Sequence, residues 1–391
     1  MATPNIRFKG FTDDWEQRKL GEICERVTRK NKNGESDLPL TIASQYGLID
    51  QRDFFNKVVA AKDMSNYYLL KKGEFAYNKS YSNGFDYGSI KRLNAYEQGC
   101  LSTLYICFGI TSDDVESDYL ECYFDTLKWY EDVSQICAEG ARNHGLLNVD
   151  TKAFFDEVTI EMPSSKEEQR KISAYLNNLD NLITLHQRKC DDTKKIKKYL
   201  LSKMFPKNGS KIPEIRFKGF TDDWEQRKLE AVVDSVDTGK SKFDKEGSSG
   251  EYPILGSTSV IGYDDEYDYE GDFILTARVG ANAGSLYRHA GKVKISDNTV
   301  FIQASKNIEF LYHLLTQFDI KKLSFGTGQP LVKASELKNL ELMMPTDINE
   351  QMKIGEYFKQ LDNLITLHQR KCDVLKELKK YMLQNMFPQK G

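Results

Sequence analysis

The sequence predicts a mixed α/β (α+β) protein in which two globular domains are joined by two long antiparallel coiled-coil helices, as a pseudo-twofold internal repeat. Two duplicated blocks, and the dissimilar sequence between them, carry this prediction. Residues 6–20 recur unchanged as residues 215–229, and residues 179–191 recur unchanged as residues 361–373. The chain therefore runs through a frame segment, an insert and a helix, and then repeats that order.

The two inserts, residues 21–159 and 230–340, have almost no residue-level similarity. Both predict more strand than helix, because short apolar and β-branched runs are bounded by Gly, Pro and polar residues. Each insert also predicts one amphipathic helix, near residues 119–136 and near residues 308–323. The predicted strands include 75–78 and 104–108 in the first insert, and 252–255, 272–276, 291–295 and 299–302 in the second.

The duplicated helical block lies within a longer amphipathic stretch. Apolar residues recur at helical spacing from about residue 166 to residue 204, over a length typical of coiled coils. At ~1.5 Å per residue this helix would be about 58 Å long. Neither copy can bury its apolar stripe alone, so we expect the two copies to pack against each other, although each could instead serve its own globular core. The residues predicted to pack between the helices or against a partner are Leu179, Leu182, Ile183, His186, Leu361, Leu364, Ile365 and His368.

The repeat places the domain boundaries. We expect a first frame and domain over 1–163, a helix over 164–206, a second frame and domain over 207–345, and a second helix over 346–391. Both helices are followed by Met-Phe-Pro, and the first then leads into the second frame segment. Because residue 391 could be followed by residue 1 in the same order, we expect the two termini to lie close together.

Composition is that of an ordinary globular protein, with 40% hydrophobic and 29% charged residues. The sequence shows no run of apolar residues long enough for a membrane span and no signal-peptide pattern, so we expect a cytoplasmic protein with no membrane contact. The seven cysteines are odd in number and form no Cys-x-x-Cys pair, which favours reduced, buried thiols. A net charge of −3 excludes a global attraction to nucleic acid, so any DNA contact must come from local patches.

Catalytic motifs are missing. No two prolines are adjacent, which excludes the Asn/Asp-Pro-Pro-aromatic loop of stand-alone amino-methyltransferases. Gly239-Lys240-Ser241 is similar to the end of a phosphate-binding loop, but Asp234 stands where that loop needs its leading glycine. The five histidines show no metal-ligand spacing. We therefore expect no catalytic residue, no metal site and no cofactor in this chain, and a free-standing methyltransferase or nuclease is disfavoured.

Polar loops in the inserts are the remaining candidates for a binding site. Arg, Asn and Gln side chains pair with base edges in the major groove of DNA, although any one of these residues could simply be solvated. The candidate DNA-binding residues are Lys79, Ser80, Tyr81, Asn83, Arg142, Asn143, His144, Lys240, Arg278, Asn282, Arg288, Thr327 and Gln329. A lysine run after residue 193 adds Lys194, Lys197 and Lys198 as candidates. These lysines either stabilise the C-terminal end of the helix or face DNA phosphates, and the sequence leaves both interpretations open.

The duplicated frame resembles one known family. Each half opens with Arg-Phe-Lys-Gly-Phe-Thr-Asp-Asp-Trp-Glu-Gln-Arg-Lys-Leu and enters its helix through Met-Pro and then Glu168-Gln169 or Glu350-Gln351. Each half closes with Leu-Asp-Asn-Leu-Ile-Thr-Leu-His-Gln-Arg-Lys. Over the whole chain this arrangement is similar to the DNA-specificity (S) subunit of type I restriction-modification systems.

The resemblance implies that each insert is a target recognition domain that reads one half of a bipartite site in double-stranded DNA, and that the helices form the spacer. It also implies two modification subunits, which methylate adenine with S-adenosylmethionine, and restriction subunits that use ATP and Mg²⁺. None of these cofactors would bind to this chain. The alternative from the residues alone is a coiled-coil scaffold that presents two protein-binding domains.

Overall fold

The structure, a computed structural model, describes residues 3–388 apart from 44–46, 56–59, 81–83, 144–145, 208, 243–248 and 324–329, and the side chains of 138–143 and 146 are not described either. The chain divides into two compact units. Unit 1 comprises Met1–Leu185 and Cys372–Gly391, and unit 2 comprises His186–Lys371. The division falls within both long helices, so each unit contains one frame segment, one insert and half of each long helix.

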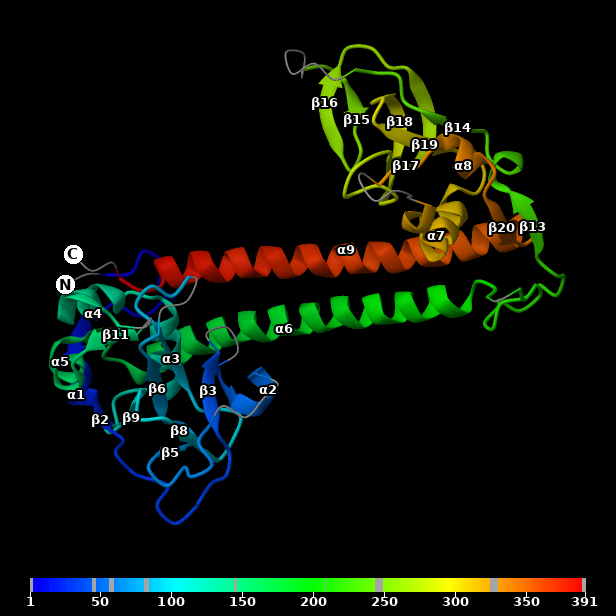
Figure 1. The fold of residues 1–391 in the computed structure, drawn as a ribbon. Coiled ribbons are helices and arrows are strands. Elements are labelled where there is room, and N and C mark those ends of the chain that lie inside the picture. Colours follow the sequence, from blue (N-terminus) through cyan, green and yellow to red (C-terminus); the bar gives the residue numbers. More distant parts are fainter. Residues whose placement is uncertain are drawn as a thin grey trace. The chain divides into compact units, whose positions relative to one another are not determined.

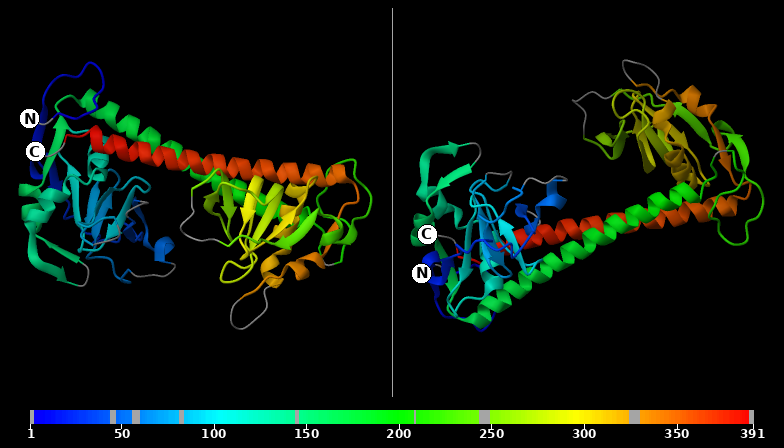
Figure 2. Two further views of the ribbon diagram at one scale, coloured as in Figure 1. Left: turned by 90° about the horizontal axis from the view of Figure 1, so that it is seen from above. Right: turned by 60° about the horizontal axis from the view of Figure 1, so that its bottom comes forward.

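Two long helices, α6 (Lys166–Lys203) and α9 (Ile348–Asn385), correspond to the duplicated helical stretches. In unit 1 the Cys372 thiol lies 3.9 Å from the Ile183 carbonyl, and in unit 2 the Cys190 thiol lies 3.8 Å from the Ile365 carbonyl. Later residues of one helix thus meet earlier residues of the other, and within each unit the two helices pack antiparallel (Figures 1 and 2). The predicted pairing of the two copies is confirmed.

Unit 1 contains a four-stranded antiparallel sheet in the order β2-β9-β6-β7. Its strands are β2 (Cys24–Arg26), β9 (Ile106–Ile110), β6 (Phe75–Asn78) and β7 (Ser89–Arg92). Smaller ladders pair β3 (Leu40–Ala43) with β4 (Gly47–Asp50), β5 (Tyr68–Lys71) with β8 (Gln98–Leu101), and β10 (Cys137–Asn143) with β11 (Leu146–Val149). The helices are α1 (Leu20–Ile23), α2 (Gln51–Phe55), α3 (Ser117–Asp125), α4 (Tyr130–Ile136) and α5 (Thr151–Glu157).

Unit 2 contains a six-stranded sheet in the order β14-β19-β17-β18-β15-β16. Its strands are β14 (Ser235–Thr238), β19 (Thr299–Gln303), β17 (Tyr269–Ala277), β18 (Leu286–Ile295), β15 (Tyr252–Leu255) and β16 (Val260–Asp264). The helices are α7 (Ile308–Phe318) and α8 (Ala334–Lys338), with 3-10 turns at Leu229–Ala231 and Ile320–Leu323. The first four strands of this sheet repeat the order β2-β9-β6-β7 of unit 1, although the two inserts share no sequence.

The predicted insert helices are each interrupted. The helix expected near 119–136 is two helices, α3 and α4, and Leu127 between them has φ 62°. The helix expected near 308–323 ends at Phe318, where Asp319 has φ 63° and a 3-10 turn follows. A non-glycine residue in the left-handed region cannot continue an α-helix, so these two residues end the helices that the apolar pattern alone extends.

The frame segments form the same structure in both units. In unit 1, β1 (Trp15–Lys19) pairs antiparallel with β12 (Thr159–Pro163), and in unit 2, β13 (Glu225–Lys228) pairs with β20 (Glu341–Met344) in the same register. Each frame also holds an ion pair whose carboxylate is buried. Arg7 Nε lies 2.7 Å from Glu168 Oε1, and Arg216 Nε lies 2.7 Å from Glu350 Oε1.

The chain closes on itself as the repeat predicts. The Ile6 amide donates to the Asn385 carbonyl at 2.9 Å, and the equivalent Ile215 amide donates to the Lys203 carbonyl at 3.0 Å. Phe387, after α9, is buried in the core of unit 1, as Phe205, after α6, is buried in the core of unit 2. The first frame segment and the end of the last helix therefore lie side by side (Figure 1).

The described helices include none that is both long enough and apolar enough to cross a membrane. All seven cysteines are free thiols, and six of them are buried.

Candidate nucleic-acid interface

Two of the candidate loops occupy equivalent places in the two sheets. Lys79 and Ser80 directly follow β6 in the connection to β7, and Arg278 and Asn282 lie in the connection from β17 to β18. Because β6-β7 and β17-β18 are equivalent hairpins, dissimilar sequences present polar residues at the same position of one topology. This equivalence was not predicted, because the loops share no sequence and can be matched only through their strands.

In unit 1, the β6–β7 connection lies against the start of β11. The Lys79 carbonyl accepts a hydrogen bond from the Leu147 amide at 2.9 Å, and the Ser80 amide donates to Asn78 Oδ1 at 3.0 Å. Burial, and then the nearby Arg26, lower the pKa of the Lys79 ammonium. The structure thus brings the residue after β6 beside β11, the strand that follows the second candidate loop in the sequence. Tyr81, Asn83 and His144 lie outside the described residues, and the side chains of Arg142 and Asn143, in β10, are likewise not described.

In unit 2, Arg278 is exposed and makes no side-chain hydrogen bond or ion pair within the described part of the chain. Its backbone forms hydrogen bonds to two other segments. The Arg278 amide donates to the Asn298 carbonyl at 3.0 Å, and the Arg278 carbonyl accepts from the Val332 amide at 2.8 Å. Asn282 is also exposed. Residues just after the third candidate loop therefore lie beside Arg278, while Thr327 and Gln329 in that loop are outside the described residues.

Lys240 is exposed at the rim of a hollow of about 540 Å³ in unit 2. Two acids in this hollow already have partners, because Asp264 pairs with Lys294 at 3.0 Å and Asp268 accepts from the Ser241 hydroxyl at 2.7 Å. The hollow therefore has a mixed charge. Lys240 is the candidate DNA-binding residue that lines it, and its side chain is exposed.

Arg288 forms ion pairs within the protein. Its guanidinium, on β18, pairs with Glu309 of α7, lies 3.3 Å from Asp362 Oδ2 on α9, and stacks 4.2 Å from the centre of the Tyr312 ring. In unit 1, Arg92 on the equivalent strand β7 pairs with Asp118 of α3 at 2.6 Å. Arg288 thus links the sheet of unit 2 to α7 and α9 through ion pairs. Contact between Arg288 and a DNA base stays a prediction.

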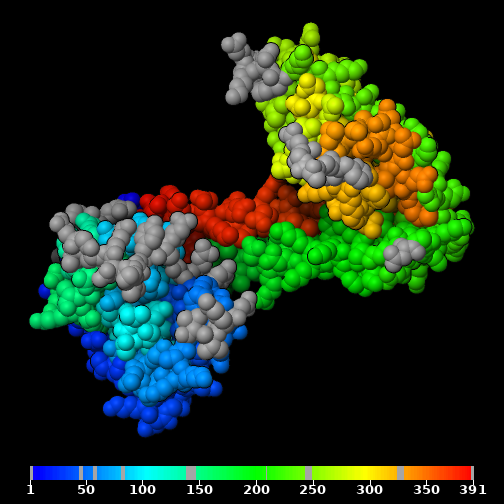
Figure 3. All heavy atoms as spheres, in the orientation of Figure 1, coloured from blue at the N-terminus to red at the C-terminus, as the bar shows by residue number. Residues whose placement is uncertain are grey.

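The lysine run after residue 193 divides into two kinds of side chain. Lys197 forms an ion pair with Asp362 of α9. Lys194 and Lys198 are exposed and line a hollow of about 550 Å³ together with Lys207. The half of α6 that carries these lysines is a continuous exposed surface in the space-filling view, coloured green (Figure 3). Lys197 is therefore engaged by the other long helix, and both interpretations, the helix end and the DNA phosphates, stay predictions for Lys194 and Lys198.

The predicted helix-packing residues differ in burial. Leu179 and Leu361 are buried, Ile183 and Ile365 are half-buried, and the equivalent pair Leu182 and Leu364 is exposed. The last two side chains are therefore not covered by packing between α6 and α9.

His186 and His368 meet between the two helices, with their Nδ1 atoms 3.0 Å apart. Burial, and then the neighbouring His368, lower the pKa of His186. Because this hydrogen bond joins two ring nitrogens, one ring must donate from Nδ1 and the other must accept. Within the described part of the chain, no cluster of three or more His, Cys, Asp or Glu side chains is arranged to hold a metal ion.

The ion pairs that join the two long helices to each other were not predicted from the sequence. Lys379 Nζ lies 2.8 Å from Asp180 Oδ2 in unit 1, and the equivalent Lys197 pairs with Asp362 in unit 2. The sequence did contain a signal for these pairs. Asp180 and Asp362 are equivalent by the repeat, as are Lys197 and Lys379, so two antiparallel copies of the helix carry opposite charges that can meet twice.

Comparison with known proteins agrees with this arrangement. The family model described as "Type I restriction modification DNA specificity domain" matches residues 12–198 and again residues 221–377. The type I restriction enzyme MjaVIII specificity subunit of Methanocaldococcus jannaschii is 27% identical over 327 residues, which is 73% of each protein. The type I restriction enzyme EcoprrI specificity subunit of Escherichia coli is 27% identical over 115 residues, 29% of this chain and 28% of that protein.

Solved structures share the fold. The crystal structure of a type I restriction-modification S subunit from M. genitalium has a TM-score of 0.67 at 15% identity, over 100% of both chains. A chain from a structural study of complex assembly in the type I restriction-modification system has a TM-score of 0.51 at 16% identity, over 96% of this chain and 98% of that chain. With both halves matched by one family model, this chain belongs to the family of DNA-specificity proteins of type I restriction-modification systems.

Proposed function

We propose that this chain is the sequence-specific DNA-binding subunit of a type I restriction-modification complex, acting in the cytoplasm, and that each insert domain reads one half of a bipartite site. The observation that carries the proposal is the equivalence of the β6–β7 and β17–β18 connections. One topology presents Lys79 and Ser80 in one unit and Arg278 and Asn282 in the other. Side chains that differ at equivalent positions would select different bases.

The chemistry of modification and cleavage is assigned to partners. We propose that two modification subunits methylate adenine with S-adenosylmethionine and that restriction subunits use ATP and Mg²⁺. Support for two copies of one partner comes from exposed apolar residues that occur as equivalent pairs on α6 and α9, each between 37% and 55% exposed. These pairs are Leu182 and Leu364, Leu185 and Leu367, Ile196 and Leu378, and Tyr199 and Tyr381. Exposed apolar side chains grouped in this way are typical of protein–protein contacts.

Domain exchange tests the assignment of half-sites. Replacing residues 21–159 by the corresponding insert of another family member should change one half of the methylated sequence and leave the other half unaltered. Replacing residues 230–340 is the matched control and should change the opposite half. A change in both halves, or in neither, contradicts the proposal. Methylated positions would be mapped on DNA after incubation with the assembled complex.

We further propose that α6 and α9 set the spacer between the half-sites. Four residues inserted into α6 and at the equivalent position of α9 would add about 6 Å of helix, which is about two base pairs of DNA. The tolerated spacer should lengthen by that amount, and an unchanged spacer contradicts this role. A coiled-coil scaffold for two protein ligands would give no sequence-specific DNA shift with or without modification subunits.

A further inference from the structure

The lysine–aspartate pair that joins α6 to α9 is the same in both units, but each insert domain bonds to a different member of it. In unit 1 the pair is Lys379 and Asp180, and in unit 2 it is Lys197 and Asp362. The four side chains are equivalent by the internal repeat, so the helices offer both domains the same two charges.

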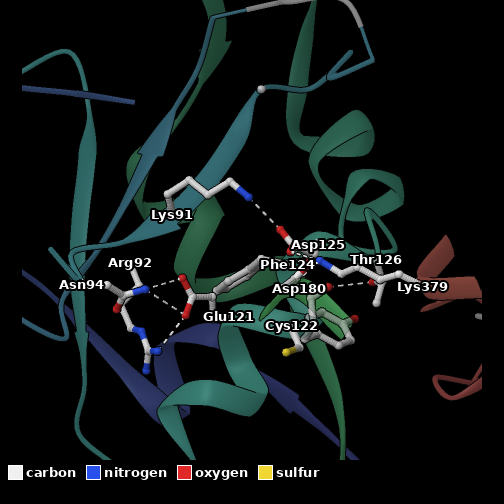
Figure 4. A network of polar contacts seen from close by, with 12 residues as sticks. Lys91, Arg92, Asn94, Glu121, Cys122, Phe124, Asp125, Thr126, Asp180 and Lys379 are labelled. Carbon is white, nitrogen blue, oxygen red and sulfur yellow. Dashed lines mark hydrogen bonds and ion pairs between the residues drawn. The ribbon is translucent and has the colours of Figure 1, made fainter. Parts of the chain in front are cut away.

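In unit 1 the insert domain bonds to the lysine. Asp125, at the end of α3, places Oδ2 3.4 Å from Lys379 Nζ and accepts with Oδ1 from Lys91 Nζ at 2.7 Å (Figure 4). Lys379 and Asp125 are 18% and 28% exposed. Burial opposes the charge on Asp125, but Lys91 and Lys379 together hold the pKa of its carboxyl below the ordinary value. A charged chain thus runs from β7 through α3 to α9 and α6.

In unit 2 the insert domain bonds to the aspartate. Arg288 of β18 lies 3.3 Å from Asp362 Oδ2, while Lys197 of α6 pairs with Oδ1 of the same carboxylate. Glu309 of α7 pairs with the same guanidinium. The insert domain therefore contributes a cation here, whereas in unit 1 it contributes an acid.

The strands that carry these bonds also border the candidate reading loops. Lys91 lies on β7, which follows the loop of Lys79 and Ser80. Arg288 lies on β18, which follows the loop of Arg278 and Asn282. Partly buried ion pairs have a defined geometry, and reading of base edges tolerates errors of only about 0.5 Å in the supporting residues.

We propose that Lys379 and Asp362 are positioning residues, which orient the first and the second insert domain, respectively, on the α6–α9 pair so that each domain reads its half-site. This inference rests on the proposed function. It predicts that equivalent residues have unequal roles. Among the described residues, Lys197 and Asp180 pair only with the other long helix, whereas Lys379 and Asp362 also pair with an insert domain.

The test uses the full chain assembled with its modification subunits and a DNA library that carries every single-base change in each half-site. Lys379→Met should lower discrimination at the half-site of unit 1 by about tenfold, the effect of ~1.4 kcal/mol, and leave the other half-site unaltered. Lys197→Met is the matched control, since the Arg288–Asp362 bond survives it. Asp362→Asn should lower discrimination at the half-site of unit 2, with Asp180→Asn as its control.

A double-mutant cycle separates positioning from general loss of stability. Asp125→Asn should lower discrimination at the same half-site as Lys379→Met, and the loss in the double variant should be smaller than the sum of the two single losses, because both substitutions remove the Asp125–Lys379 ion pair. Additive losses, equal effects of Lys379→Met and Lys197→Met, or unchanged discrimination in all variants would each overturn the inference. A wild-type complex without any sequence preference would instead overturn the proposed function itself.

Discussion

The two units dock equivalent insert helices, α3 and α7, on the same frame residues, but the side chains that the two helices bury differ. Asn307 Nδ2 and the Glu116 amide donate to Gln351 and Gln169, which are equivalent frame residues at the start of the long helices. These bonds show that α7 of unit 2 and α3 of unit 1 occupy equivalent positions, each within its own unit. Six residues after Asn307 stands His313, and six residues after Glu116 stands Cys122.

His313 and Cys122 are both buried, yet their chemistry differs. Burial raises the pKa of the Cys122 thiol, which therefore stays neutral and behaves as a small apolar group. His313 has no exposed surface, and neither of its ring nitrogens has a hydrogen-bond partner within the described part of the chain. The frame residues therefore set the position at which the insert helix packs, while the sequence of the insert sets which side chains are buried at that contact.

The largest expected effect tests whether the two frames are equivalent. Arg7→Met leaves the carboxylate of Glu168, only 1% exposed, without its partner, and should lower the free energy of unfolding of unit 1 by about 3–5 kcal/mol. Arg216→Met should do the same to unit 2 through Glu350, which is also 1% exposed. Hydrogen exchange measured separately for the strand pair β1 and β12 and for the strand pair β13 and β20 would detect each loss. Exchange that accelerates equally in both units for either variant would show that the units do not respond separately.

A smaller effect tests a position at which an insert helix lies closer to the long helix in unit 2 than in unit 1. A Cβ at Gly355 of α9 would lie 2.6 Å from the Phe310 amide nitrogen of α7, whereas the equivalent Ser173 of α6 donates to the Gln169 carbonyl at 3.0 Å. Gly355→Ser should therefore destabilise unit 2 by about 1–3 kcal/mol through overpacking.

The reciprocal change, Ser173→Gly, should cost about 1 kcal/mol, because glycine is a poor helix former. Denaturant unfolding of both variants would measure the two losses. Equal losses would mean that α7 can move away from α9 without cost.

A pH-dependent effect tests the contrast between His313 and Cys122. Burial, aided by Lys197 and Arg288, lowers the pKa of His313 from 6.5 to about 3. Between these values the unfolded chain binds a proton that the folded chain does not, so stability falls as the pH falls, by up to about 1.4 kcal/mol per pH unit. His313→Cys should remove this part of the pH dependence.

Melting temperatures of both proteins between pH 7 and pH 5 would measure the difference in slope. Cys122→Ala is the control and should leave the slope unaltered. If His313→Cys retains the wild-type slope, the acid sensitivity arises elsewhere.

The smallest expected effect tests the exposed lysines of α6. Replacing Lys194 and Lys198 by glutamine should flatten the dependence of DNA affinity on salt by about 0.9 in log–log slope for each DNA phosphate that the protein no longer neutralises. Lys197→Gln should change this slope little, because its ammonium is paired with Asp362. Titrations at several salt concentrations would decide, and an unaltered slope for the double variant would leave these lysines to the helix end or to a partner.

The sequence by itself determined the repeat, the antiparallel helix pair, the closed order of the chain and the family. These features follow from identity over long stretches and from apolar periodicity, which are local properties that survive without coordinates. It also predicted some of the strands, such as 75–78 and 252–255, because short apolar runs between turn residues are distinctive.

Only the tertiary structure decided that the two inserts share one sheet order, that Arg288 and Lys197 are already paired, and that Lys379 and Asp362 face different groups. Strand order and ion pairing join residues far apart in the chain, and sequences that share no residues carry no sign that they fill the same place. The breaks at Leu127 and Asp319 were likewise not predicted, because an apolar stripe continues through a left-handed residue that ends the helix. In this protein, identity between the halves shows where the frame is, and packing against that frame decides how each insert is held.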